Sequence, residues 1–443
     1  MEVRAQFNEA VRNIAARSRD AEQYLLAARR CDSDTGIATH GRRLSVPEPG
    51  IECFVYTVDL QGAARAERRN AALHPNNTIV SPGIWMWRPL LGFDDEIVVR
   101  FELPEGLQVS VPWERIENLD NAYRLLASPQ SGTALSIFGQ FDAQIIKAGD
   151  ASLRVDILRT GLKTDISAIT NWIADTANNI VRAYGRFPNP EARIVVVPAG
   201  RGRGDSPVRF GRVVRDGGET IELMIDPTQP MQMFYENWTA THEFSHLMLP
   251  YLQSEQRWVS EGFAQYYQNV LLARAGRYTQ RYAWQKLFDG LERGRDSVPE
   301  LSPNDAAARD ERNSRMKIYW SGAALALLAD VELRRRSGGD QTLDSVLGEF
   351  QECCLPSRRT WTGVELFTRF DSFLDEPLFM DLYRQHADTA GFPAVRPLLQ
   401  DLGVVREGNE IQMSDAAELA PVRRAMTGRD ASVPDYDSPP RDR

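Results

Sequence analysis

The sequence predicts a multidomain α+β protein, in which an all-β, sandwich-like domain precedes a mainly helical domain. The chain has 443 residues, more than one hydrophobic core usually fills. Its hydrophobic content of 42% is sufficient for packed cores. The apolar period is close to two between residues 46 and 162 and becomes helical after residue 163.

The first segment, residues 1–45, is expected to be helical. Val3, Phe7 and Val11 recur at roughly helical spacing among many charged residues. This pattern is typical of an amphipathic helix on a protein surface. We therefore expect a helix within residues 3–29.

Residues 46–162 are expected to form the all-β domain. Strand-forming residues dominate the runs IECFVYTVDL, EIVVRFELPEG and ASLRVDILRTG. Proline and glycine lie between these runs, as they do in the turns that join short strands. The arrangement favours a β-sandwich.

Residues 163–402 are expected to form the second domain, with a small β part over 191–226 and a helical part over 231–400. Within it, Asp165 is a candidate N-cap for a helix that ends before Pro188. A buried strand, ARIVVVPAG, follows this helix, and two further strands flank the turn at Gly217–Gly218.

The remaining residues, 403–443, are expected to form a C-terminal extension. Its end, from about residue 427, is polar and rich in proline. Such a composition buries too little apolar surface to offset the entropy of ordering the chain. We therefore expect the tail to be disordered.

Composition narrows the classes of partner. The formal charge of −9 argues against a general affinity for nucleic acid or anionic membranes, and favours a peptide or protein substrate. No apolar run approaches the ~20 residues of an integral membrane segment. The N-terminus lacks the apolar core of a signal peptide, although a processed chain would look the same. Localisation, including export to the periplasm or the exterior, and oligomeric state stay open.

Cysteine is scarce, with four residues and no C-x-x-C metal spacing. A bridge between Cys31 and Cys53 is compatible only with an oxidising compartment, so it stays open with the localisation. Cys353 and Cys354 are neighbours, and a bond between them would strain the backbone. We expect these two to be buried thiols.

The segment NWTATHEFSHLMLPYLQSEQRWVSEGFAQYYQNV carries the chemistry. His242 and His246 lie four residues apart in a helical pattern, so both imidazoles share one face and can bind one Zn²⁺ ion. Glu243 would lie beside that ion, where it can take a proton from zinc-bound water as the water attacks a carbonyl. Two histidines on a helix face can also be ordinary hydrogen-bonding residues, but the intervening glutamate favours a metal site in a chain with only five histidines.

A catalytic zinc ion needs a third protein ligand and one open position. Glu261 can supply the third ligand, because it lies in a second helical pattern, WVSEGFAQYY, that a short turn can return beside the first. A structural zinc site is disfavoured, since such sites usually close with four ligands and prefer cysteine.

Three stretches resemble the gluzincin metallopeptidases, and among them the glycyl aminopeptidase family. HEFSH matches the zinc helix, WVSEGFAQYYQ is similar to the third-ligand helix, and IYWSGAALALLADVELRRRSGGDQTLDSVL is similar to a Tyr-x-x-Gly helix and the Gly turn after it. The resemblance implies a thermolysin-like, mainly helical zinc peptidase domain behind the β domain. It also implies that Tyr319 hydrogen-bonds the oxyanion of the tetrahedral intermediate.

The chain departs from this family in places. The resembling enzymes carry a glutamate near a Gly-rich strand that binds the free amine of the substrate. The candidates here are Glu219, directly after Gly217 and Gly218, and Glu222. The connection between the zinc helix and the third-ligand helix is shorter than usual. We also expect the family's terminal PDZ domain to be missing, because about forty residues follow residue 402 in this sequence.

These observations predict a zinc-dependent peptidase, and an aminopeptidase rather than an endopeptidase. Glu243 and Tyr319 are the expected catalytic residues, and His242, His246 and Glu261 the expected ligands of one zinc ion. The alternative is a non-catalytic, peptide-binding protein that retains the metallopeptidase fold.

Overall fold

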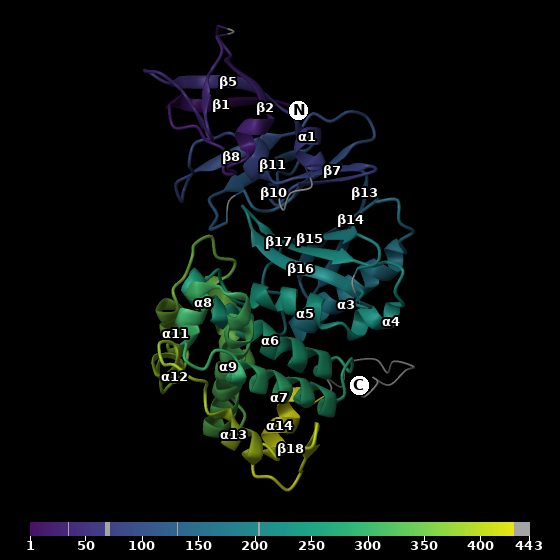
Figure 1. Ribbon diagram of the computed structural model, residues 1–443, viewed down its shortest axis with the longest axis vertical. Coiled ribbons are helices and arrows are strands. Elements are labelled where there is room, and N and C mark those ends of the chain that lie inside the picture. Colours follow the sequence, from purple (N-terminus) through teal and green to yellow (C-terminus); the bar gives the residue numbers. More distant parts are fainter. Residues whose placement is uncertain (34, 67–70, 131, 203, 429–443) are drawn as a thin grey trace.

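The computed structural model describes residues 1–33, 35–66, 71–130, 132–202 and 204–428. The molecule is elongated, with an N-terminal β-rich domain at one end and a helical domain at the other (Figure 1). A five-stranded sheet lies between them. This order of a β-rich part and a helical part confirms the predicted fold class.

The N-terminal segment is a strand, so the prediction of a helix over residues 3–29 is wrong. β1 (Glu2–Val11) and β2 (Leu25–Arg30) both pair antiparallel with β5 (Ile51–Val58). Val3, Phe7 and Val11 recur every four residues, a spacing that one face of a strand satisfies as well as a helix does, because four is a multiple of two. Pairing with β5, which lies far along the chain, makes this segment a strand.

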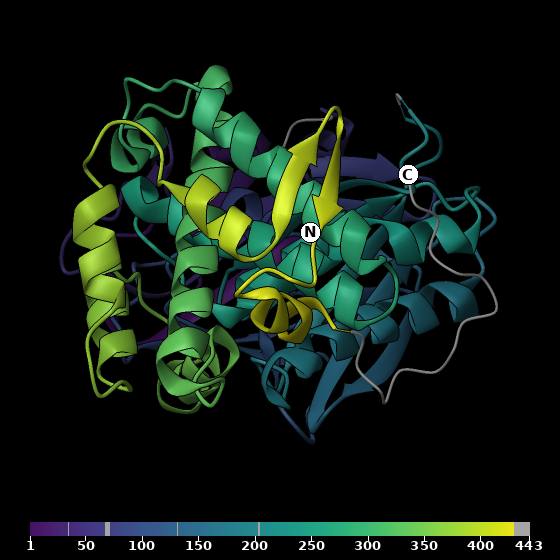
Figure 2. The same ribbon diagram turned by 90° about the horizontal axis from the view of Figure 1, so that it is seen from below.

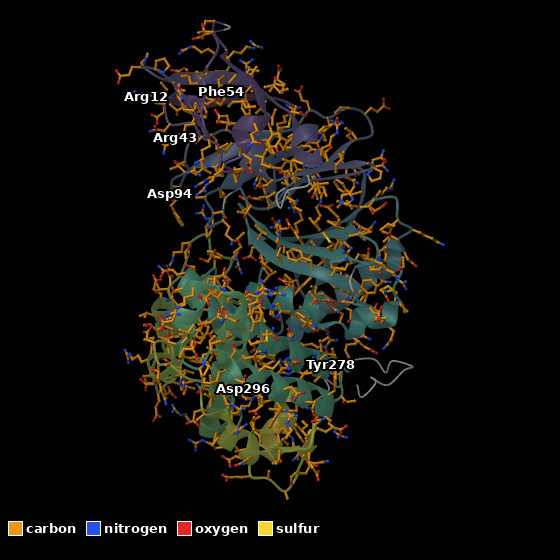
Figure 3. The ribbon with its side chains drawn as sticks, viewed as in Figure 1. Arg12, Arg43, Phe54, Asp94, Tyr278 and Asp296 are labelled. Carbon is orange, nitrogen blue, oxygen red and sulfur yellow. A yellow bond between two sulfur atoms is a disulfide. The ribbon has the colours of Figure 1, made fainter. Side chains whose placement is uncertain are left out.

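Two further sheets complete the N-terminal domain. One has the order β10-β11-β8 and the other β6-β7-β12-β9. Their strands are β6 (Ala71–His74), β7 (Asn77–Val80), β8 (Glu96–Arg100), β9 (Gln108–Ser110), β10 (Glu114–Arg115), β11 (Ala122–Leu126) and β12 (Ser136–Gly139). The short strands β3 (Thr39–His40) and β4 (Arg43–Leu44) form a hairpin, and α1 (Leu60–Arg65) and α2 (Pro82–Trp85) are short helices. Phe54 is buried in the core of this domain, whereas Arg12 and Arg43 lie toward its outside (Figure 3).

The central sheet has the order β13-β14-β15-β17-β16. Its strands are β13 (Phe141–Ala148), β14 (Ala151–Leu158), β15 (Ala192–Pro198), β16 (Val208–Arg215) and β17 (Glu219–Ile225). β14 pairs parallel with β15, so this sheet crosses the domain boundary that the sequence placed at residue 162. β16 is an edge strand, antiparallel to β17.

Helix α3 (Ile166–Tyr184) connects β14 to β15 and packs on the helical side of the sheet. The side chain of Asp165 accepts a hydrogen bond from the amide of Ala168, which confirms the predicted N-cap. Gly185 ends the helix in the left-handed conformation. The buried strand after the helix and the two strands around Gly217–Gly218 are likewise confirmed.

The helical part follows the sheet. Its helices are α4 (Met231–Glu236), α5 (Trp238–Ser245), α6 (Arg257–Arg274), α7 (Gln280–Asp296), α8 (Pro303–Arg309), α9 (Arg315–Ser337), α10 (Leu343–Cys354), α11 (Gly363–Asp371), α12 (Phe379–His386) and α13 (Val395–Asp401). In the described part of the chain, no helix combines the length and the apolar character needed to cross a bilayer.

The C-terminal extension folds back onto the helical domain. It contains the hairpin β18 (Val404–Glu407) and β19 (Glu410–Met413), followed by α14 (Ala420–Thr427). Seen from below, these elements cover the end of the domain (Figure 2). The amide of Ile411 donates to Gln285 Oε1 at 2.8 Å. The tail predicted to be disordered lies, from residue 429 on, outside the described residues.

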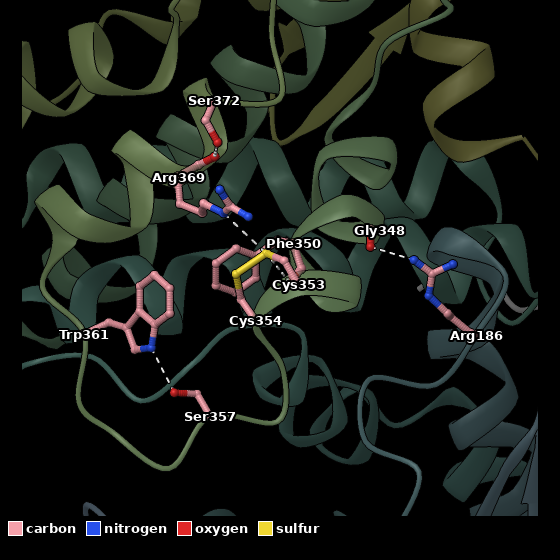
Figure 4. The surroundings of a disulfide bond; sticks show 9 residues. All are labelled: Arg186, Gly348, Phe350, Cys353, Cys354, Ser357, Trp361, Arg369 and Ser372. Atoms are coloured by element: carbon pink, nitrogen blue, oxygen red, sulfur yellow. Dashed lines mark hydrogen bonds between the residues drawn. A yellow bond between two sulfur atoms is a disulfide. The ribbon is translucent and has the colours of Figure 1, made fainter.

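All four cysteines are bridged. Cys31 pairs with Cys53, and Cys353 pairs with its neighbour Cys354 (Figure 4). The expectation of two buried thiols at 353 and 354 is therefore wrong, and Cys353 is also exposed. The pair lies at the C-terminal end of α10, where the next residue, Leu355, is already extended. The two cysteines are the last two residues of α10, so the bond forms at the helix end, and the expectation that adjacency excludes it does not hold.

Candidate active site

Helix α5 presents the two histidines. It begins at Asn237, whose side chain accepts a hydrogen bond from the amide of Thr239. The rings of His242 and His246 lie on one face, with centroids 4.8 Å apart. His246 stands where the α-helix passes into a 3₁₀ turn. The predicted imidazole pair is thus present.

Helix α6 brings Glu261 to the same point. Its Oε2 lies 3.3 Å from His242 Nε2 and 3.7 Å from His246 Nε2. One ligand atom from each of the three residues lies within 4.8 Å of the others. The structure therefore brings together the three residues that the sequence nominated as a metal site.

The other ring nitrogens of both histidines are engaged by α6. Gln268 Oε1 lies 2.9 Å from His242 Nδ1, and Ser260 Oγ lies 3.0 Å from His246 Nδ1. A hydrogen bond at Nδ1 leaves the lone pair of Nε2 directed at the shared centre. Neither partner was predicted, although Gln268 lies two helical turns after Glu261 and so on the same face of α6.

The donor set fits zinc. Two imidazole nitrogens and one carboxylate oxygen are the ligands of many catalytic zinc sites, which leave a fourth position open. The partners at both Nδ1 atoms are of the kind that orients metal-binding histidines. No cysteine belongs to the group, as expected for a site that is not purely structural.

Two glycines set the distance between α6 and α9. A Cβ on Gly262 would lie 2.2 Å from the Cα of Gly322, and a Cβ on Gly322 would lie 2.1 Å from the carbonyl oxygen of Trp258. The helix backbones therefore touch. This crossing places Tyr319, one turn before Gly322, near the metal site, with its ring centroid 6.4 Å from that of His242.

A third glycine makes room for Glu243. A Cβ on Gly211, in edge strand β16, would lie 2.5 Å from Glu243 Cγ. The side chain of Glu243 is 8% exposed between this strand and α5. Gly211 could not be identified from the sequence, because only the folded structure shows which glycine faces the helix.

Burial governs the protonation of these groups. It raises the pKa of Glu243 to about 7, and the charge of His242 opposes this rise. Burial also lowers the pKa of His246 to about 3 and raises the pKa of Tyr319 to about 12. Burial opposes ionisation of His242, but its hydrogen bond to Glu261 and the charges of Glu243 and Glu261 raise its pKa overall.

The predicted substrate-binding glutamates occupy other positions. Glu219 accepts a hydrogen bond from Arg215 Nε at 2.9 Å and another from Asn189 at 3.0 Å. Glu222 pairs with Arg212 and accepts from the amide of Leu135. Both carboxylates are buried. The structure thus places both in ion pairs within the sheet and not in the metal site.

Gly217 and Gly218 form the turn between β16 and β17, against the N-terminal domain. A Cβ on Gly218 would lie 1.8 Å from the carbonyl oxygen of Pro112, and one on Gly217 would lie 2.5 Å from Leu125 Cδ1. Close packing between domains therefore requires glycine at both positions. Neither residue is in the group of potential metal ligands.

Arg215 links the sheet to the zinc-binding helix. Its guanidinium donates to the carbonyl oxygens of His246 at 3.0 Å and Leu249 at 2.8 Å. These carbonyls belong to the turn that ends α5, where positive charge is favoured. Glu219 holds the same guanidinium in place. No sequence motif indicated this role.

Comparison with known proteins places the fold. Residues 251–325 match the model of the M61 glycyl aminopeptidase family, over the segment that includes Glu261 and Tyr319. No curated protein matches the chain. Among solved structures, the chain is similar to an aminopeptidase N family protein from Idiomarina loihiensis, at a TM-score of 0.68 and 14% identity over 91% of this chain and 76% of that one.

Two other solved structures are similar. One is an M1 zinc metallopeptidase from Deinococcus radiodurans, with a TM-score of 0.50 and 11% identity over 88% of this chain and 87% of that chain. The other is yeast LTA4 hydrolase, with a TM-score of 0.53 and 13% identity over 90% of this chain and 67% of that chain. The fold is that of the M1 zinc metallopeptidases. The family match and the similar solved structures both agree with the resemblance to gluzincin aminopeptidases found in the motifs.

Proposed function

We propose that this protein is a zinc-dependent peptidase that hydrolyses peptide bonds in the site formed by α5, α6 and α9. The observation that carries the proposal is the meeting of His242, His246 and Glu261 next to a buried Glu243 and to Tyr319. The fold and the partial match to a peptidase family support the same function.

Each group has a role in the reaction. Bound zinc would polarise the substrate carbonyl and lower the pKa of water. Glu243 takes one proton from the attacking water, whose oxygen forms the new bond to the carbonyl carbon. Tyr319 donates a hydrogen bond to the oxyanion that develops. When the C–N bond breaks, Glu243 returns the proton to the leaving amine.

Edge strand β16 offers a place for the substrate backbone. Because β16 ends the sheet, an extended peptide can pair with its outer edge through main-chain hydrogen bonds. Gly211 in this strand touches Glu243, so a peptide bound along β16 would pass the proposed catalytic carboxylate. This arrangement supports a peptide as the substrate.

Aminopeptidase activity is the first candidate for the kind of cleavage, because the family match and the similar solved structures include aminopeptidases. One observation favours an endopeptidase as the second candidate. Glu219 and Glu222, the carboxylates expected to bind a free amine, are each neutralised by an arginine. An enzyme that recognises the free amino terminus of its substrate would need another negatively charged group to bind it.

Replacement of Glu243 tests the mechanism. Glu243→Gln should retain zinc and lose peptide hydrolysis, whereas Glu349→Gln, an exposed position on α10, should be as active as the unchanged protein. Metal content and steady-state kinetics are the measurements. Normal hydrolysis by Glu243→Gln would contradict the proposal.

Peptides with free and blocked amino termini separate the candidates. Cleavage restricted to free-amine peptides indicates an aminopeptidase, and internal cleavage of blocked peptides indicates an endopeptidase. Binding without any cleavage would indicate the non-catalytic peptide-binding alternative.

A further inference from the structure

Two arginines lie at the same end of the helices that carry the site. Arg257 is four residues before Glu261 on α6, and Arg315 is four residues before Tyr319 on α9. Residues four apart share one helix face. Each arginine is thus one turn from a residue of the proposed active site.

The two helices run in the same direction. Along them, Gly262 meets Gly322, and further on Tyr266 donates a hydrogen bond to Asp330 at 2.6 Å. Their first turns are therefore neighbours. Asp310, just before α9, pairs with Arg257 and confirms that these ends meet.

Each of the two guanidinium groups has few hydrogen-bond or ion-pair partners. Arg257 pairs with Asp310, but its buried Nε has no hydrogen-bond partner among the described residues. Arg315 is exposed and, in the described part of the chain, forms no ion pair or side-chain hydrogen bond. An arginine that has neither is available to a ligand.

Both positive charges reach the site. Burial raises the pKa of Tyr319, and the charges of Arg315 and Arg257 oppose the rise. The hydrogen bond from Arg257 lowers the pKa of Asp310, and the charge of Arg315 adds to this effect. The charges of both guanidinium groups thus act on the hydroxyl of Tyr319 and on the carboxylate of Asp310.

We propose that Arg315, assisted by Arg257, binds a carboxylate of the peptide next to the bond that is cut. Guanidinium pairs with carboxylate through two parallel hydrogen bonds, which makes arginine suited to this recognition. The carboxylate can be an aspartate or glutamate side chain or the C-terminus of a short peptide. The inference names a substrate class for the peptidase and rests on that proposed function.

Binding to an uncut complex tests the inference directly. Zinc-loaded Glu243→Gln is titrated with fluorescent peptides that carry one glutamate at successive positions, each paired with the glutamine peptide. A second set compares a free C-terminus with a carboxamide. At least one acidic peptide should bind about tenfold more tightly than its neutral partner, as a charge-assisted pair allows. The set that discriminates identifies the source of the carboxylate.

Substitution of Arg315 should abolish that preference. Adding Arg315→Gln should bring the affinity ratio close to one, and Arg315→Glu should favour peptides with lysine at the same position. Arg335→Gln is the matched control, because Arg335 is exposed on the same helix, about 30 Å along it from Arg315, and pairs with Glu332. Thermal melting of each variant shows whether it is folded.

The outcomes separate this inference from the proposed function. A ratio unchanged by Arg315→Gln, or no discrimination by any peptide, would overturn the carboxylate site even if peptides are cleaved. If the binding preference depends on Arg315 but the protein cleaves no peptide, the carboxylate site is supported and the proposed peptidase function is contradicted.

Discussion

The hydroxyl of Tyr319 is the group through which helix α9 contributes most directly to the proposed chemistry. It comes from α9, whereas the metal ligands come from α5 and α6. Burial keeps the hydroxyl protonated, with a pKa of about 12. It can therefore donate a hydrogen bond to an oxyanion throughout the neutral pH range.

Tyr319→Phe should lower kcat by roughly 10²–10³-fold, the usual effect of removing one oxyanion donor. KM should change little, since the hydrogen bond forms mainly in the transition state. Steady-state kinetics with a cleaved peptide measures both constants. Tyr24→Phe, in the N-terminal domain, is the control and should keep full activity. An unchanged kcat in Tyr319→Phe would remove this residue from the mechanism.

Only part of the site could be predicted from the sequence. His242, Glu243, His246 and Glu261 could be identified because helical spacing and zinc chemistry together select them. Gln268 and Arg215 contact the histidine ring and the helix end only after α6 and the sheet have packed on α5. Such contacts depend on tertiary structure, which no local pattern encodes.

The crossing of α6 and α9 is the element on which the site geometry depends. The two helices meet at Gly262 and Gly322 and are joined again by the buried hydrogen bond from Tyr266 to Asp330. Asp330 also accepts from Arg334 Nε and from the amide of Leu343, so the helix pair is tied to α10.

Gly322→Ala should destabilise the protein by about 1–3 kcal/mol and lower its activity. Alanine favours a helix by up to about 1 kcal/mol over glycine, but the new Cβ would lie 2.1 Å from a backbone oxygen that cannot move without shifting α6. Overpacking therefore dominates. Urea unfolding and peptide hydrolysis are the measurements.

Gly348→Ala on α10 is the matched control, because its Cβ would lie 3.2 Å from the Cβ of Tyr184. It should change the free energy of unfolding less than Gly322→Ala does. Equal effects would show that helix contact at Gly322 is not the cause.

The elements also show where sequence patterns were insufficient. The long helix after Asp165 could be predicted, because its cap and its period agree. Strand β1 could not, because its apolar residues fit both periods and its partner β5 is some forty residues away. The bridge between Cys353 and Cys354 could not be predicted either, because adjacency alone argued against it.

At the scale of the whole molecule, a bound metal ion should contribute to stability, because the ligands come from helices that are separate in the sequence. At a free zinc concentration of 100 Kd, the expected gain is about 2.7 kcal/mol. Calorimetry with and without a chelator measures it as a shift in the Tm of the helical domain. Glu261→Ala should lose most of this shift, and the absence of any shift in the unchanged protein would contradict a zinc site.

A buried polar cluster joins the N-terminal domain to the central sheet. Arg193 in β15 donates to Ser110 Oγ and to the carbonyl oxygen of Leu135, both at 2.9 Å. Ser110 in turn donates to Asp156 Oδ2. Buried charges of this kind are stable only while all partners are present, so the two domains are held in one arrangement.

The sharing of a sheet has a consequence for how this chain can be divided. β13 and β14 precede the boundary that the sequence suggests, yet they belong to the sheet, because β14 pairs parallel with β15 and β13 pairs antiparallel with β14. A fragment starting at residue 163 would expose the unpaired backbone N–H and C=O groups along the edge of β15, which can pair with other chains and cause aggregation. Any shortened version for engineering or recombination must therefore keep β13 and β14 together with β15.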